Sequence, residues 1–321
     1  MIAARAEQHV RAALIAAEDE EAAPAERAEM LMEMAMGLQQ RPQSPDELAA
    51  AIRLYDTALR LCPAQDRLLR ARIAARRGTA LQALPESGTE SLEAACAAYE
   101  AAIPDLAALG RPEELAEAEM NFGLVLQHLA GIGHARITDA IAAYQRALRT
   151  FDRTHHPVEF AILQNNLATA FLSMSAAEGG AMRQAMAVQA FAAALEVVTM
   201  IDHPSEYAML QNNLGNALQH AASSHPVENR LRALDAYDEA LRVRRADNMP
   251  VEYANTIANK AGCLWSLAEI ALEPKDALPA ARAYYQEAQA IFAAHGDQEK
   301  AAIIAQALVQ LDRERTAVSP L

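Results

Sequence analysis

Residues that interrupt helices are scarce in this sequence. Its 321 residues include 12 glycines and 14 prolines, and aromatic residues make up only 5%. Few helix breakers favour long helices joined by few tight turns. Hydrophobic residues still account for 52% of the chain, which favours a folded core over a disordered protein.

Cysteine is rare, with three residues at Cys62, Cys96 and Cys263. They are far apart and form no CxxC pair, so neither a disulfide framework nor a zinc ribbon is expected. Long apolar runs are missing as well, and no run approaches 18 apolar residues. The longest one near the N-terminus, residues 12–17, ends at Glu18. Such a run is too short for the core of a signal peptide or for a membrane span. We therefore expect a soluble protein of the reducing cytoplasm.

Basic charge is in deficit. The 28 lysines and arginines face 42 aspartates and glutamates, which gives a formal net charge of −14. A general nucleic-acid binder needs a basic surface to neutralise phosphates, and an anionic membrane attracts basic segments. We therefore expect neither nucleic acid nor membrane among the partners.

Motifs for catalysis or cofactor binding are also absent. The sequence contains no GxGxxG, GxxxxGK[ST], GxSxG or HExxH pattern. Four histidines, His155, His156, His203 and His225, precede predicted helix starts, but no carboxylate or cysteine completes a metal-binding constellation around them. We expect these histidines to serve turns, and we predict no catalytic residue, no cofactor and no metal site.

One pattern recurs six times: alanine, three residues, an aromatic residue, two residues, alanine. Its steps of four and three place all three side chains on one face of a helix, where small alanines let a neighbouring helix approach the ring. The starts are 44, 45, 47, 46 and 48 residues apart. The copies are Ala51–Tyr55–Ala58, Ala95–Tyr99–Ala102, Ala140–Tyr144–Ala147, Ala187–Phe191–Ala194, Ala233–Tyr237–Ala240 and Ala281–Tyr285–Ala288.

A Pro-x-Glu pattern alternates with the first, most clearly at Pro157 and Pro204 and more weakly at Pro112 and Pro250. Proline is tolerated in the first helical turn, and a glutamate two residues later favours the positive end of the helix dipole. Each copy therefore predicts the start of a helix, and the repeat unit is a pair of helices A and B.

The predicted fold is all-α, an α-α superhelical solenoid of about six helix pairs with capping helices. Residues 1–23 form an N-terminal capping helix and residues 313–321 a flexible tail. The predicted repeats span 24–62, 63–111, 112–156, 157–203, 204–249 and 250–296, followed by a capping helix at 297–312. Exposed loops are expected at 84–90, 177–182 and 221–229.

These residues resemble tetratricopeptide repeats (TPRs), whose signature has a small residue in helix A and Ala, an aromatic and Ala in helix B. Gly123, Ala168, Gly215 and either Gly262 or Ala261 match the small position. The period of about 46 exceeds the usual repeat of about 34 residues. The strings HHPVEFAILQNNLA (155–168) and DHPSEYAMLQNNLG (202–215) resemble the kinesin-light-chain subtype, which also occurs beside caspase-like CHAT proteases. The usual tryptophan early in helix A is absent, because Trp265 lies late in its helix.

Asparagines recur in the A helices, which line the concave face of such arrays. We call six of them the asparagine ladder: Asn121, Asn165, Asn166, Asn212, Asn213 and Asn259. Stacked helices are about 8–10 Å apart and an extended peptide advances about 3.3 Å per residue, so each repeat can meet every third peptide group. The resemblance to the kinesin light chain implies the same use. The alternative is that the ladder bonds to neighbouring helices and stabilises their stacking.

Five arginines cluster in the second A helix: Arg67, Arg70, Arg72, Arg76 and Arg77. Arg72 and Arg76 share a face that should point inward and be exposed, where they can bind the carboxylates of an acidic segment. The alternative is pairing with acidic residues of the same chain. The carboxylate clamp of chaperone-binding repeats is not reproduced, because the next A helices lack basic residues.

The sequence thus predicts a non-enzymatic module that binds a protein segment or peptide, as a scaffold, an adaptor or a dedicated assembly chaperone. The competing prediction is a sensor whose concave pocket takes a short peptide or a small ligand.

Overall fold

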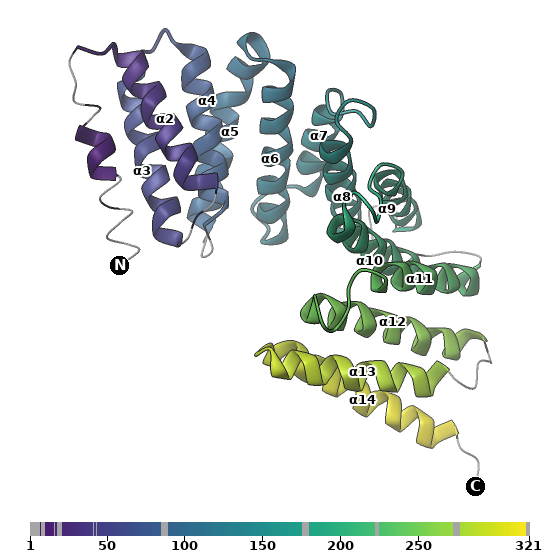
Figure 1. Cartoon of the computed structure of the whole chain (residues 1–321). Helices are drawn as coiled ribbons and strands as arrows, with labels where there is room; N and C mark the ends of the chain where they lie inside the picture. Colours follow the sequence, from purple (N-terminus) through teal and green to yellow (C-terminus); the bar gives the residue numbers. More distant parts are fainter. Residues whose placement is uncertain are drawn as a thin grey trace. The chain divides into compact units, whose positions relative to one another are not determined.

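A computed structural model of the chain contains only α-helices as regular structure in the part that it describes (Figure 1). It describes residues 7, 10–15, 17, 21–40, 42, 44–84, 89–174, 180–221, 225–271 and 277–318. The helices fall into two compact units, Met1–His155 and His156–Leu321. The predicted leading helix is described in part, and residues 10–15 of it are helical. In the predicted loops, residues 85–88, 177–179 and 222–224 lie outside the described residues, whereas residues 89–90, 180–182 and 226–229 are helical, so these loops are shorter than predicted.

Within each unit, every helix packs against the next one along the chain. Unit 1 comprises α2 (Pro24–Gln40), α3 (Pro45–Leu61), α4 (Arg67–Gln82), α5 (Thr89–Leu109), α6 (Pro112–Gly131) and α7 (Ile137–Ala147). Unit 2 comprises α8 (Pro157–Ser173), α9 (Gly180–Leu195), α10 (Pro204–His220), α11 (Pro226–Leu241), α12 (Pro250–Ala271), α13 (Ala277–Ala294) and α14 (Gln298–Val318). The even-numbered helices α2 to α12 are the A helices, and α3 to α13 are the B helices.

The Pro-x-Glu pattern marks helix starts as predicted. Helices α6, α8, α10 and α12 all begin at the proline, with the glutamate in the first turn. The last helix, α14, differs from the prediction because it continues to Val318 instead of ending near residue 312. None of the described helices is long and apolar enough to cross a membrane.

A small buried residue recurs at one place in every A helix, and where it is glycine it lies against the aromatic ring of the following B helix. Counted from the first residue of its helix, the twelfth residue is glycine or alanine in every A helix and is buried. These residues are Ala35, Gly78, Gly123, Ala168, Gly215 and Ala261. This register selects Ala261, not Gly262, as the small residue of the last pair.

Glycine is required where the ring approaches most closely. A Cβ added to Gly123 would lie 2.6 Å from the ring of Tyr144, and one added to Gly215 would lie 2.6 Å from the ring of Tyr237. Both tyrosines are fully buried, and their hydroxyls donate hydrogen bonds to the paired A helix. The repeated Ala–aromatic–Ala pattern therefore holds each B helix against the A helix that precedes it.

One more buried position recurs seven residues after each aromatic ring. It is apolar in five repeats and arginine in one: Cys62, Leu106, Phe151, Val198, Arg244 and Phe292. Arg244 is 8% exposed, and its Nη1 donates to Thr256 Oγ1 at 3.0 Å. Its Nε has no acceptor within the described part of the chain. Burial lowers the pKa of Arg244.

Candidate functional site

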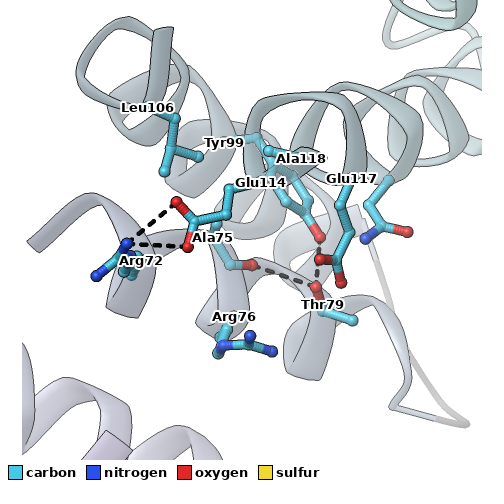
Figure 2. A pocket seen from close by; sticks show the side chains of 10 residues that line it. Arg72, Ala75, Arg76, Thr79, Tyr99, Leu106, Glu114, Glu117 and Ala118 are labelled. Carbon is cyan, nitrogen blue, oxygen red and sulfur yellow. Dashed lines mark hydrogen bonds and ion pairs between the residues drawn. The ribbon is translucent and has the colours of Figure 1, made fainter. Parts of the chain in front are cut away.

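A polar pocket in unit 1 lies between α4 and α6 (Figure 2). Helix α4 contributes Arg72, Arg76 and Thr79, and α6 contributes Glu114 and Asn121. Leu106 and Tyr99 from α5 also line it, and the Tyr99 hydroxyl lies 2.8 Å from Thr79 Oγ1. The structure thus brings Arg72, Arg76 and Asn121, three of the predicted site residues, to one pocket.

Arg72 is paired within the chain. Its Nη2 lies 3.0 Å from Glu114 Oε1, and its side chain is 37% exposed, so it is less open than the sequence predicted. Burial raises the pKa of the Glu114 carboxyl, but hydrogen bonds from the Arg111 backbone and the Arg72 guanidinium outweigh it, and the net shift is downward. An incoming carboxylate would have to compete with Glu114 for Arg72.

Arg76 differs from the other arginines of α4. Arg67 pairs with Asp105, Arg77 donates to Asp56 at 2.6 Å, and Arg70 donates to backbone carbonyls. Arg76 makes no hydrogen bond or ion pair to any residue that the structure describes, and its half-buried side chain lines the pocket. It is therefore the guanidinium in this pocket with the most capacity for an anionic group.

In unit 2, the asparagines bond to one another across three A helices. Asn259 of α12 donates from Nδ2 to Asn212 Oδ1 of α10 at 3.1 Å, and Asn212 donates to Asn213 at 3.4 Å. Asn213 donates to Asn165 of α8 at 3.2 Å, and Asn165 donates to Asn166 at 3.3 Å. The four bonds form one continuous series. An amide has two N–H donors and two lone pairs, so the inner members keep hydrogen-bonding capacity for a ligand.

The helix starts also change the register of the ladder. Counted from the first residue of its helix, Asn259 is the tenth, like Asn121, Asn166 and Asn213. Asn165, Asn212 and Asn259 are spaced by 47 residues, which by itself would align Asn259 with Asn165 and Asn212. The starts of α8, α10 and α12 are 47 and 46 residues apart, however, so Asn259 aligns with Asn166 and Asn213. Arg76 is the tenth residue of α4, so it occupies the ladder position of its repeat.

Unit 2 carries an apolar pocket between α8 and α10 that sequence reasoning missed. Its volume is about 150 Å³. The lining residues are Val158, Ala161, Ile162, Asn165, Val198, His203, Glu206, Met209 and Leu210. Val158, Ile162 and Met209 are 41%, 42% and 37% exposed. The signal was present in the sequence, because Ile162 and Met209 stand at the same place in the two best copies of the repeat.

The two pockets occupy equivalent places in their repeats. Ile162 is the sixth residue of α8 as Arg72 is of α4, and Glu206 is the third residue of α10 as Glu114 is of α6. The buried residue below each pocket is Leu106 in unit 1 and Val198 in unit 2. The space between two successive A helices thus forms a polar pocket in unit 1, and the equivalent space in unit 2 forms a largely apolar pocket.

Other reactive groups do not gather into a site. Among the described residues, no group of three histidine, cysteine, aspartate or glutamate side chains could hold a metal ion. Burial raises the pKa of Cys96 to about 11 and that of Cys263 to about 11. Both thiols therefore remain protonated near neutral pH, where the thiolate would be the nucleophile.

Comparison with solved structures identifies the fold as TPR-like. A crystal structure of BtubC (BKLC) from P. vanneervenii has a TM-score of 0.54 and 21% identity, and the match covers 77% of this chain and 91% of that chain. A STAND protein with a tetratricopeptide repeat sensor from Pyrococcus horikoshii has a TM-score of 0.50 and 12% identity. That match covers 86% of this chain but 42% of the other. The chain is thus a TPR-like array of helix pairs.

No protein-family model matches the sequence, and a comparison with curated proteins finds no match either.

Proposed function

We propose that this chain is a non-enzymatic module that holds a segment of another protein in the groove between its A helices. The observation that carries the proposal is the apolar pocket of unit 2. Three large apolar side chains, Val158, Ile162 and Met209, are exposed around it, and the amide of Asn165 lines it. Ligand sites combine apolar walls with a few placed polar groups in this way.

The remaining asparagines of the ladder extend the proposed contact along the groove. Each inner amide uses one donor and one acceptor within the ladder and can offer the others to a peptide group. In unit 1, Arg76 and Asn121 line one pocket, where Arg76 can bind a carboxylate of an acidic segment. The proposed site residues are Asn121, Asn165, Asn166, Asn212, Asn213, Asn259, Arg72 and Arg76.

Scaffold, adaptor and dedicated assembly chaperone are the roles that fit such a module. The kinesin-light-chain-like subtype remains a prediction that rests on the two best copies of the repeat. A sensor for a short peptide or small ligand is the second candidate. The apolar pocket favours it, since about 150 Å³ is enough for a small organic group.

Capture on the immobilised full chain, followed by mass spectrometry, tests the proposal. Extract from the source cells should yield a protein that Ile162→Glu combined with Met209→Glu no longer retains. Ile201→Glu is the matched control, because Ile201 is 87% exposed and does not line the pocket. A small molecule released from the purified chain and lost in the double variant would favour the sensor. Capture that is equal in all variants would contradict a groove-bound partner.

A further inference from the structure

The groove between α8 and α10 is acidic as well as apolar. Neither helix contains a lysine or an arginine. Glu206 of α10 is exposed, lines the apolar pocket and forms no ion pair within the described residues. His203 lies beside it in the pocket wall. The carboxylate of Glu206 thus lies at the edge of an apolar surface, and no cation among the described residues bonds to it.

The equivalent carboxylate in unit 1 shows how such a position binds a cation. Glu114 forms an ion pair with Arg72 of the preceding A helix, with 3.0 Å between Arg72 Nη2 and Glu114 Oε1. In unit 2 the place of Arg72 is taken by Ile162, which cannot neutralise Glu206. Unit 2 therefore has the carboxylate of this ion pair, Glu206, but an apolar residue, Ile162, in place of the arginine.

The size of the pocket limits the apolar group that it accepts. A cavity of about 150 Å³ in an engineered protein core holds a benzene molecule. The unit 2 pocket has a comparable volume of about 150 Å³, so it fits the end of a leucine, methionine or phenylalanine side chain.

We propose that this pocket selects an extended partner segment with a large apolar residue and a lysine or arginine two positions away. The inference rests on the proposed function and names the chemistry of its ligand. Side chains two residues apart point to the same side of an extended peptide. One then enters the pocket between Ile162 and Met209 while the other supplies the cation that Glu206 lacks. Asn165 is placed to bond the peptide backbone between them.

The alternative is that Glu206 serves its own helix. A carboxylate in the first turn stabilises the helix dipole, and every Pro-x-Glu copy has one. Glu228 of α11 provides the matched control: it is exposed, it stands two residues after Pro226, and it does not line the pocket. Helix stabilisation predicts the same behaviour for Glu206→Gln and Glu228→Gln.

Fluorescence anisotropy with three labelled peptides tests the proposal on the full chain. The probe is Ala-Lys-Ala-Leu-Ala-Lys-Ala, which offers lysine on either side of leucine, and in the other two peptides both lysines become glutamine or glutamate. We expect the order of affinity lysine, glutamine, glutamate. Glu206→Gln should weaken only the lysine peptide, by about 2–5-fold, as expected for an exposed ion pair. Glu228→Gln should change nothing.

Three results would overturn the inference: equal binding of the three peptides, equal effects of the two glutamine variants, or no binding of any peptide. The proposed function has its own readout. If the captured partner is lost from the Ile162→Glu, Met209→Glu variant but binds Glu206→Gln with wild-type affinity, the groove binds a partner without this selectivity.

Discussion

Replacing Asn213 with alanine tests what the asparagine ladder does. The side chain donates to Asn165 and accepts from Asn212, at 3.2 and 3.4 Å. Bonds of this length lie at the weak end of the range, so their loss should cost about 1 kcal/mol together. Asn212 is only 8% exposed, and leaving its N–H without an acceptor adds about 1 kcal/mol or more. Part of this loss is offset, because the higher helix propensity of alanine adds up to about 0.7 kcal/mol to the stability of the variant.

The expected net loss is therefore about 1–2 kcal/mol. For a unit of this size, the melting temperature should fall by roughly 2–8 °C. Asn121→Ala is the matched control, because Asn121 has the same place in its helix and no side-chain hydrogen bond within the described residues. It should leave stability unchanged or raise it slightly. Urea unfolding followed by far-UV circular dichroism measures both variants.

Partner affinity measured on the same proteins separates the two roles of the ladder. A less stable Asn213→Ala that binds normally assigns this residue to helix stacking. A variant that melts like Asn121→Ala would show that the hydrogen bonds contribute nothing to stability, and our reasoning would be refuted.

Three further predictions concern the packing and charge of the repeats. Gly215→Ala should lower the free energy of unfolding by about 1 kcal/mol net, because the added methyl group meets the ring of Tyr237. Gly37→Ala should raise it by up to about 1 kcal/mol, because a methyl group there lies in open space. Urea unfolding of both variants tests whether the two changes have opposite signs. Arg244→Leu with Thr256→Leu should melt at or above the wild-type temperature, because a buried charge without a carboxylate partner gives way to apolar packing; a clear loss would show that the hydrogen bond is needed. Glu114→Gln should be less stable than wild type at neutral pH, and the gap should close below the ordinary pKa of 4.5, because a carboxyl with a lowered pKa stabilises only while ionised; a pH-independent gap would contradict this.

Much of the fold could be predicted because its signals are local. The position of Tyr237 between two alanines and the start of α10 at Pro204 depend on residues within one or two turns. The Ala–aromatic–Ala pattern occurs six times, and each copy has to be buried against a neighbouring helix. The extension of α14 to Val318 was missed because the polar end of the chain was expected to fray, although Pro320, two residues further on, is a helix-stop signal.

The sequence by itself therefore determined the helix pairs, their order and the residues that bring each ring against its small partner. The tertiary structure decided which side chains meet across repeats. The ion pair between Arg72 and Glu114 is seen only in the structure. In the equivalent place of unit 2, Glu206 lines an apolar pocket together with Ile162. The physical reason is distance along the chain. Packing within a helix pair follows from a fixed local period, whereas contacts between A helices depend on one-residue differences in register, such as the one that places Asn259 beside Asn212.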